Sequence, residues 1–329
     1  MRLLRRQFLR LAAGAVALPA VSRVATAQTF PSRPMTIVVG FPPGSTMDTS
    51  ARILAERMKV ALGQPVLIEN VAGAGGSLGV GRVVRAAPDG YTISIGDMGN
   101  YVANQEIYPL QYNLRTDLQP IAKIATGAYL IVGRNGMPAS DLKELVGWLR
   151  ANPDKASAGT GGVGTTDHLA GIIFQNSTGT RVRFIPYRGT VLALQDMLAE
   201  QIDIAFASSA VSLPHVRSGR IKAYAVMGTS RLAAAPEIPT VDEAGVPGAH
   251  YLPWLALWAP KGTSKAIIAR LNDAAVDTLA DSTVRARFAD LGLDVPPRDQ
   301  QTPEWLGAFH KAELEKWLPI IKAANMKGE

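Results

Sequence analysis

The stretch from Met35 to Leu62 constrains the fold most, because it predicts a buried strand that passes directly into a helix. Residues 35 to 39 are a largely apolar, β-branched run, typical of a strand buried on both faces of a parallel sheet. Pro42, Pro43 and Gly44 then indicate a turn, and apolar residues at three- and four-residue steps predict a helix over residues 49 to 62. The N–H groups at such a helix start suit a carboxylate or a phosphate, and an ordinary capped turn is the alternative.

A second turn of this kind runs from Ser157 to His168, ahead of a helix predicted over residues 169 to 176. Its glycines at 159, 161 and 164 fit G-x-G-x-x-G, so a dinucleotide site has to be considered. The acid that would bind the ribose is missing, because the next strand ends in Pro186-Tyr187-Arg188. We therefore interpret the glycines as a cradle of backbone donors. His168 has no neighbouring histidine or cysteine, which favours a hydrogen-bonded structural residue over a base or a metal ligand.

Strands alternate with helices along the chain, which predicts an α/β fold built on parallel sheets. We expect further strands over 64–69, 91–96, 182–185, 202–206, 221–227 and 255–259, and helices over 140–151, 191–200, 211–217, 266–279, 284–291 and 303–324. Residues 97 to 112 break this pattern and are expected to be a functional loop. The order predicts domain 1 over residues 28–130, an inserted domain 2 over 131–248, and a return to domain 1 over 249–329. Two chain crossings imply a hinge.

Motifs for catalysis or metal binding are weak. Residues 75 to 79 fit the G-x-S-x-G pattern of a nucleophile elbow around Ser77, but six loop residues separate Gly76 from Glu69, the end of the preceding strand. The chain has no cysteine and four scattered histidines, so we expect no metal site and no cofactor. An exported oxidoreductase or hydrolase that uses a glycine-rich turn stays as the alternative function.

Residues 1 to 27 have the pattern of an export signal: a basic start, an apolar stretch and Ala25-Thr26-Ala27 before Gln28. Arg5-Arg6 also fits a twin-arginine signal, and the general secretory route stays open. We expect cleavage near Ala27 and a periplasmic mature protein. The segment holds five of the 34 Lys and Arg residues and no acid, so 29 basic residues face 27 acidic ones after cleavage, a net charge of +2. A charge this small excludes a basic surface for nucleic acid.

Several motifs, in order along nearly the whole mature chain, resemble the substrate-binding proteins of tripartite tricarboxylate transporters, the Bug or TctC family of periplasmic solute receptors. They are Phe41-Pro42-Pro43-Gly44 with Asp48, Glu69-Asn70 with Gly73-Ala74-Gly75-Gly76, Ala87-Pro88-Asp89-Gly90-Tyr91-Thr92, His168-Leu169-Ala170, Pro186-Tyr187-Arg188-Gly189, and Trp254 with Ala259-Pro260-Lys261-Gly262-Thr263. The resemblance implies a type II-like periplasmic binding protein: two α/β domains, joined by crossing strands, with a ligand cleft between them. It implies no catalytic residue and a small carboxylate ligand, such as a dicarboxylate, an amino acid or an aromatic acid. It also implies integral-membrane transporter subunits as partners, and we expect a monomer.

The family holds the ligand carboxylate between its first strand-to-helix turn and the glycine-rich turn of its second domain, with backbone N–H groups and water. The implied ligand-binding residues are Phe41, Gly44, Ser45, Thr46, Met47, Asp48, Gly75, Met98, Gly99, Gly161, Val163, Gly164, Thr165, Thr166, Asp167, His168, Tyr187, Arg188 and Ser208. The chain departs from the family at Ser45, where a second glycine is usual, at Asp167, where a small hydroxyl residue is usual, and at Ala207, where an acid is frequent. An Asp167 side chain that faces the cleft would favour ligands with an amino, hydroxyl or protonated group.

Overall fold

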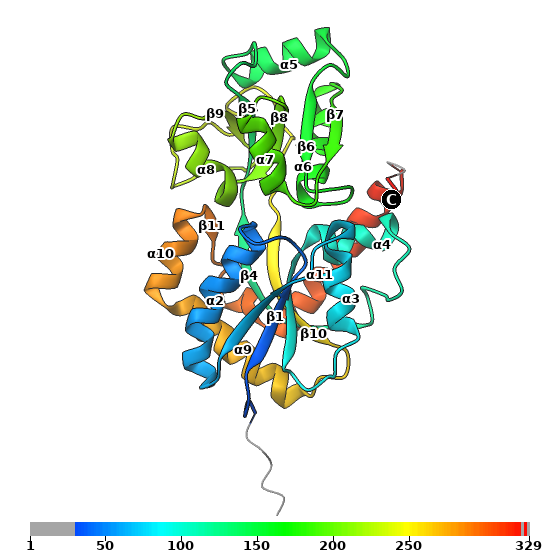
Figure 1. Ribbon diagram of the computed structural model, residues 1–329, viewed down its shortest axis with the longest axis vertical. Helices are drawn as coiled ribbons and strands as arrows, with labels where there is room; N and C mark the ends of the chain where they lie inside the picture. Colours follow the sequence, from blue (N-terminus) through cyan, green and yellow to red (C-terminus); the bar gives the residue numbers. More distant parts are fainter. Residues whose placement is uncertain (1–29, 324–325, 328–329) are drawn as a thin grey trace, which may run out of the picture.

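The computed structural model describes residues 30 to 323, 326 and 327. Two β-sheets form the centres of two stacked units (Figure 1). The six-stranded sheet has the order β11-β4-β10-β3-β1-β2 and the five-stranded sheet the order β7-β6-β8-β5-β9. The strands of the first are β1 (Met35–Val39), β2 (Val66–Asn70), β3 (Thr92–Asp97), β4 (Leu118–Gly127), β10 (Trp254–Pro260) and β11 (Leu293–Asp294). Those of the second are β5 (Tyr129–Arg134), β6 (Ser157–Thr160), β7 (Arg183–Pro186), β8 (Ile204–Ser208) and β9 (Ile221–Val226).

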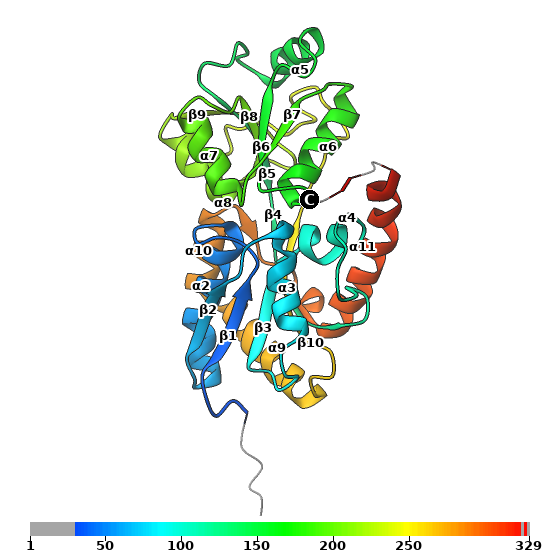
Figure 2. The ribbon, with the colours of Figure 1, turned by 45° about the vertical axis from the view of Figure 1, so that its right-hand side comes forward.

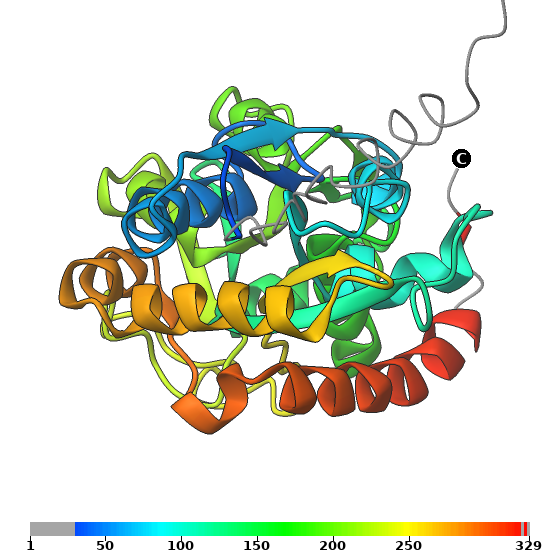
Figure 3. The ribbon, with the colours of Figure 1, turned by 90° about the horizontal axis from the view of Figure 1, so that it is seen from below.

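Helices cover both sheets, and the predicted α/β class is confirmed. The six-stranded sheet carries α2 (Thr46–Leu62), α3 (Ser77–Val84), α4 (Asn104–Ile107), α9 (Lys265–Ala280), α10 (Ser282–Asp290) and α11 (Pro303–Ala323). The five-stranded sheet carries α5 (Leu142–Ala151), α6 (Thr166–Thr178), α7 (Thr190–Leu198) and α8 (Ser209–Arg217). The long α11 runs along one side of the first unit toward the second (Figure 2), and Figure 3 shows α9 and α11 from below. Within the described ranges, no helix combines the length and the hydropathy that a membrane span requires.

The first predicted strand lies inside its sheet, as its composition indicates. β1 pairs in parallel with β2 on one side and β3 on the other, and four of its five residues are buried. The sheet is mixed rather than parallel throughout, because β10 returns from the second unit and pairs antiparallel with both β3 and β4. The carboxyl ends of β1 and β3 therefore point toward the second unit, where the turns that follow them meet it.

Two helices begin three residues earlier than predicted. α2 starts at Thr46 because the Ser45 hydroxyl accepts the N–H of Asp48, which caps the helix before Thr49. α6 likewise starts at Thr166, after Thr165 as the N-cap residue. The expectation of a loop over residues 97 to 112 is wrong in part: Gly99–Ala103 forms a π-helical turn that continues into α4. Further short helical turns occupy Ala74–Gly76 and Arg298–Gln301.

The chain crosses between the sheets at two adjacent places. Only Ala128 separates β4 of one sheet from β5 of the other, and β10 resumes the first sheet after Pro253. The two crossings are joined, because the Gly127 N–H donates to the Pro253 carbonyl at 2.8 Å. We propose that each sheet with its helices is one domain, with Ala128 as the first boundary, since the predicted boundary at residues 130 and 131 falls within β5.

Candidate functional site

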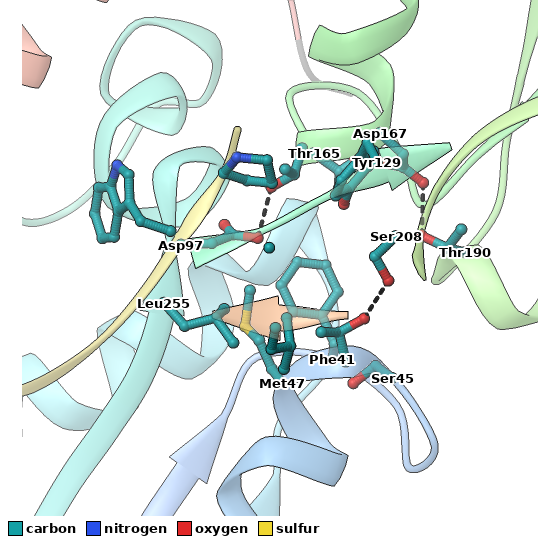
Figure 4. A pocket seen from close by; sticks show the side chains of 16 residues that line it. Phe41, Ser45, Met47, Asp97, Tyr129, Thr165, Asp167, Thr190, Ser208 and Leu255 are labelled. Carbon is teal, nitrogen blue, oxygen red and sulfur yellow. Dashed lines mark hydrogen bonds between the residues drawn. The ribbon is translucent and has the colours of Figure 1, made fainter. Parts of the chain in front are cut away.

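A cavity of about 60 Å³ lies between the two sheets, at the ends of β1, β3 and β8 (Figure 4). In this conformation the cavity is small compared with the binding sites of drug-sized ligands, which take about 300 Å³ and upward. Both crossing segments contribute to its wall. The cavity is lined by Phe41, Ser45, Thr46, Met47, Asp97, Gly127, Tyr129, Thr165, Thr166, Asp167, Thr190, Ser208, Pro253, Trp254, Leu255 and Leu293.

Four helices begin at this cavity, one from the first unit and three from the second. The N-cap residues of α2, α6 and α8, which are Ser45, Thr165 and Ser208, all line it. Thr190, the first residue of α7, lines it too. The first N–H groups of a helix have no partner within the helix and carry the positive end of its dipole. The arrangement can therefore stabilise an anion without a cationic side chain.

Not all of the cavity hydroxyls cap their own helices. Only Ser45 does so, through Asp48. The Thr46 and Ser208 hydroxyl oxygens lie 2.5 Å apart across the gap between the units. The Thr165 hydroxyl donates to Asp167 and, at 2.6 Å, to the Gly162 carbonyl. Thr46, Thr165 and Ser208 are thus held in place without serving as side-chain caps of their helices.

Asp167 lies in the first turn of α6 and is 1% exposed. One of its carboxylate oxygens accepts from the Gly161 N–H and the Thr190 hydroxyl, both at 2.6 Å, and the other accepts from Thr165 and from the N–H of His168. Burial raises the pKa of Asp167, and these donors lower it only in part. The side chain ties together the start of α6, the end of β6 and the start of α7.

Asp97 is the second acid at the cavity and ends β3 of the other unit. One carboxylate oxygen accepts from the N–H of Asn100 at 3.2 Å, and the other accepts from the Thr166 hydroxyl at 2.5 Å. Burial raises its pKa to about 6, and the nearby charge of Asp167 adds to this shift. Among the described residues that line the cavity there is no Lys, Arg or His. Two buried carboxylates therefore face the cavity without a basic side chain.

Residues 50–326 match the model of the family described as the tripartite tricarboxylate transporter family receptor, TctC. The chain belongs to the TctC family. It is 36% identical over 304 residues to a protein encoded in the TAR-I ttuE-ttuC' intergenic region of Agrobacterium vitis, which covers 92% of this chain and 88% of that protein. Among solved structures, the periplasmic binding protein BugD superposes with a TM-score of 0.86 and 35% identity, covering 91% of this chain and all of BugD. MatC from Rhodopseudomonas palustris, solved with malate, superposes with a TM-score of 0.84 and 34% identity, covering 89% of this chain and all of MatC.

Membership in TctC confirms the resemblance read from the motifs and the two-domain periplasmic binding protein fold. TctC proteins are substrate-binding receptors, not enzymes, so the alternative of an oxidoreductase or hydrolase is not favoured. Ser77 fits this conclusion, because it lies buried as the first residue of α3, 2.8 Å from the Asn104 amide, rather than on a strand-to-helix elbow. In the described part of the TctC chain, no group of His, Asp and Glu side chains could hold a metal ion.

Eight of the predicted TctC ligand residues line the cavity: Phe41, Ser45, Thr46, Met47, Thr165, Thr166, Asp167 and Ser208. Others lie beside it. Gly75, Gly161, Val163, Tyr187 and Arg188 line a neighbouring cavity that shares Phe41, and Gly44 lies on a third one near α7 and α8. Met98 accepts a hydrogen bond from the Tyr251 hydroxyl, and the N–H of Gly99 donates to Asp97. Both therefore lie behind the cavity wall.

Asp48 stabilises the turn between β1 and α2 through hydrogen bonds behind the cavity. It is 3% exposed and accepts from the Gly44 N–H, the Asn70 amide and the Arg52 guanidinium, each at 2.9 Å. Burial raises the pKa of Asp48, but these hydrogen bonds outweigh burial and hold it below its ordinary value. Asp48 therefore acts on the site by shaping the turn.

The expectation of a cradle of free glycine donors is wrong for two of its members. The Gly161 N–H donates to Asp167, and the Gly164 N–H donates to Nδ1 of His168 at 3.1 Å. Burial lowers the pKa of His168 to about 4, and its ring packs edge-on against Phe184, as a structural histidine does. These two N–H groups donate to side chains of the turn itself. The N–H groups at the helix starts are therefore the donors left for a ligand.

Sequence reasoning missed half of the cavity wall. The missed residues are Asp97, Gly127, Tyr129, Thr190, Pro253, Trp254, Leu255 and Leu293. Asp97 directly follows a predicted strand, and the carboxyl ends of parallel strands meet at one edge of a sheet, so its position carried a usable signal. Gly127 and Pro253 lie at the crossings, which only the tertiary structure brings together.

Proposed function

We propose that this TctC receptor captures a small carboxylate in the cavity between its two domains. The convergence of α2, α6, α7 and α8 on one cavity carries the proposal, because helix starts offer N–H donors and favour negative charge. Malate, a dicarboxylate, was solved with the related MatC. The proposed ligand-contacting residues are the eight predicted residues of the wall together with Asp97, Tyr129 and Thr190.

The carboxylate is proposed to lie between the starts of α2 and α6, beside the hydroxyls of Thr46 and Thr165, and the Thr165 hydroxyl would turn from the Gly162 carbonyl to donate to it. Thr46 belongs to one unit and Thr165 to the other, so a ligand there would join the two units. Gly44, Asp48, Gly161, Gly164 and His168 support the two turns from behind. In this assignment the ligand needs no Lys or Arg partner.

Isothermal titration with mono- and dicarboxylates, malate included, tests this proposal on the variants Thr46→Ala and Thr165→Ala. Loss of one hydrogen bond to a charged group costs about 1.5–3 kcal/mol, so we expect affinity to fall by about tenfold or more. Ser264→Ala is the matched control, because Ser264 caps α9 away from the cavity and its loss should lower stability alone. If both threonine variants lose stability like the control yet keep wild-type affinity, the carboxylate does not lie between these helix starts.

Delivery to the membrane subunits of a tripartite tricarboxylate transporter, and a monomeric state, extend this proposal from the family description. Periplasmic location is proposed on the same grounds. The expected signal and its cleavage near Ala27 lie outside the described residues. Cell fractionation of wild-type protein and an Arg5→Lys, Arg6→Lys double variant would separate the two export routes, since only twin-arginine export should stop.

A further inference from the structure

The ligand cavity has an unusual charge balance for a site that receives an anion. Asp97 comes from the first unit and Asp167 from the second, and both are buried. No ion pair among the described residues involves either acid. Asp48, at the corresponding turn of the first unit, differs because Arg52 neutralises it at 2.9 Å. Buried charge without a partner is costly, so a ligand that supplies the missing positive charge or a donor would be stabilised.

The two acids differ in their capacity to accept from a ligand. A carboxylate offers about four lone-pair sites. Asp167 has four donors, namely Gly161, Thr190, Thr165 and the N–H of His168, so its sites are used within the second unit. Asp97 has three donors, the Thr166 hydroxyl and the N–H groups of Asn100 and Gly99, so one of its sites is left. This leaves Asp97 as the acceptor that a ligand can reach.

We propose that Asp97 selects ligands that carry a hydrogen-bond donor beside their carboxylate, with an ammonium group preferred to a hydroxyl group. The inference rests on the proposed carboxylate function and narrows its ligand class to 2-amino and 2-hydroxy acids. The helix starts take the carboxylate, and Asp97, on the wall formed by β3, takes the donor. Asp167, whose acceptor sites are already used, adds negative potential, which favours the ammonium over the hydroxyl.

Other ionisable groups around Asp97 agree with this assignment. The hydroxyls of Tyr129 and Tyr251 face the same region, and burial raises the pKa of each well above its ordinary value, so both stay neutral. Burial also raises the pKa of Asp97 to about 6, which shows that its charged form lacks sufficient compensation without a ligand. A ligand ammonium would favour the charged carboxylate.

The test is titration of wild-type protein with succinate, malate and aspartate, which share a carbon chain and differ by no donor, a hydroxyl and an ammonium at C2. The same comparison with acids of three and of five carbon atoms tests whether the cavity prefers another ligand length. We expect aspartate to bind at least about tenfold more tightly than succinate, with malate between them, because a buried acceptor left unpaired costs about 1–3 kcal/mol. In Asp97→Asn, this ratio should fall to about one while succinate binding is kept or improved.

Asp97→Ser serves where the asparagine variant folds poorly, because its hydroxyl can still accept from Asn100. Asp203→Asn is the matched control. Asp203 pairs with Arg134 at 2.8 Å and lies at the end of β8 remote from Ser208, so its loss should lower stability and leave the ratio intact.

Equal wild-type affinity for succinate and aspartate would overturn the inference and leave the carboxylate function standing. An equal loss for all three acids in both Asp97 variants would overturn it too, since that result marks a structural residue. The diamine 1,4-diaminobutane separates the remaining cases. If the diamine binds in an Asp97-dependent way and none of the three acids binds, both the carboxylate function and the assignment of 2-amino and 2-hydroxy acids are refuted. Binding of neither acids nor diamine would also refute both.

Discussion

The carboxylate of Asp97 accepts a hydrogen bond from the hydroxyl of Thr166 at 2.5 Å, and this bond joins the end of β3 to the start of α6. It therefore spans the two units at the cavity. The Thr46 and Ser208 hydroxyls make a second bridge, also at 2.5 Å. Since both bridges lie at the cavity, residues that are proposed to bind the ligand also link the two units.

Removal of the Asp48 carboxylate should destabilise the first turn. Asp48→Ala leaves the N–H of Gly44 and the amide of Asn70 without their acceptor, so we expect a loss of about 1–3 kcal/mol in the free energy of unfolding. Arg52→Gln tests the ion pair alone. Because the Arg52 side chain is 51% exposed, its loss should cost under about 1 kcal/mol. Urea denaturation measures both, and equal losses would contradict the role of Asp48 in the turn.

Acidification should act on Asp97 and His168 in opposite directions. The pKa of Asp97 is raised to about 6, so the folded state holds this proton more tightly than the unfolded chain and gains stability as the pH falls from about 6 to 4. The pKa of His168 is lowered to about 4, so the folded state loses stability as the pH falls from 6.5 toward 4. Each shift of about two units corresponds to about 3 kcal/mol, and the two largely cancel in the wild type.

Single variants should separate the effect of Asp97 on the pH dependence of stability from the effect of His168. Asp97→Asn removes the stability that the wild type gains when Asp97 takes up a proton. The stability of this variant should therefore fall more steeply than that of the wild type between pH 6.5 and 4. His168→Asn removes the loss, so its stability should fall less steeply or rise. Chemical denaturation at a series of pH values is the measurement. Parallel wild-type and variant profiles would show that neither group is perturbed in this way.

Gly96 should tolerate no side chain. A Cβ at this position would lie 1.8 Å from the ring of Tyr101, which is fully buried and stacks on Trp258 with ring centroids 5.0 Å apart. Gly96→Ala should therefore cost about 1–3 kcal/mol or more. Gly147→Ala is the control, because nothing lies within 4 Å of its Cβ position in α5, and a gain of up to about 1 kcal/mol is expected there. Thermal unfolding that ranks the two variants in the reverse order would contradict the packing seen here.

Much of the fold could be predicted from local pattern. The largely apolar run from Met35 to Val39 is typical of a strand inside a sheet, and Gly63 ends α2 in the left-handed conformation that glycine favours. The helix starts were harder to predict. Thr46 and Thr166 have no apolar periodicity before them, and the capping contacts that begin these helices depend on side-chain geometry.

The site could be predicted where the sequence contains a recognisable turn motif. Ser45 and Thr165 lie in turn motifs and Asp97 directly follows a predicted strand, whereas the irregular composition after Asp97 hid a π-helical turn. The partners of Asp97 and Ser208 are distant in sequence, at Thr166 and Thr46, so no local pattern could pair them. The division of the chain into domains and the full set of ligand contacts accordingly stay predictions.

The last prediction concerns closure of the two units around the ligand. A third bridge, the Tyr108 hydroxyl donating to the Val163 carbonyl at 2.8 Å, lies away from the four helix starts. If closure accompanies binding, a bond made only in the closed form contributes to affinity even without touching the ligand. Tyr108→Phe should then weaken binding by about 2- to 10-fold, the equivalent of a bond worth about 0.5–1.5 kcal/mol.

Tyr224→Phe is the matched control for Tyr108→Phe, since the Tyr224 hydroxyl donates to the Ala139 carbonyl within the second unit and should affect stability alone. Small-angle scattering completes the test. Two chain crossings leave domain motion as the default, so saturating carboxylate should close the two units and reduce the radius of gyration. An unchanged radius with binding confirmed by calorimetry, together with equal affinities of Tyr108→Phe and Tyr224→Phe, would show that binding proceeds without domain closure.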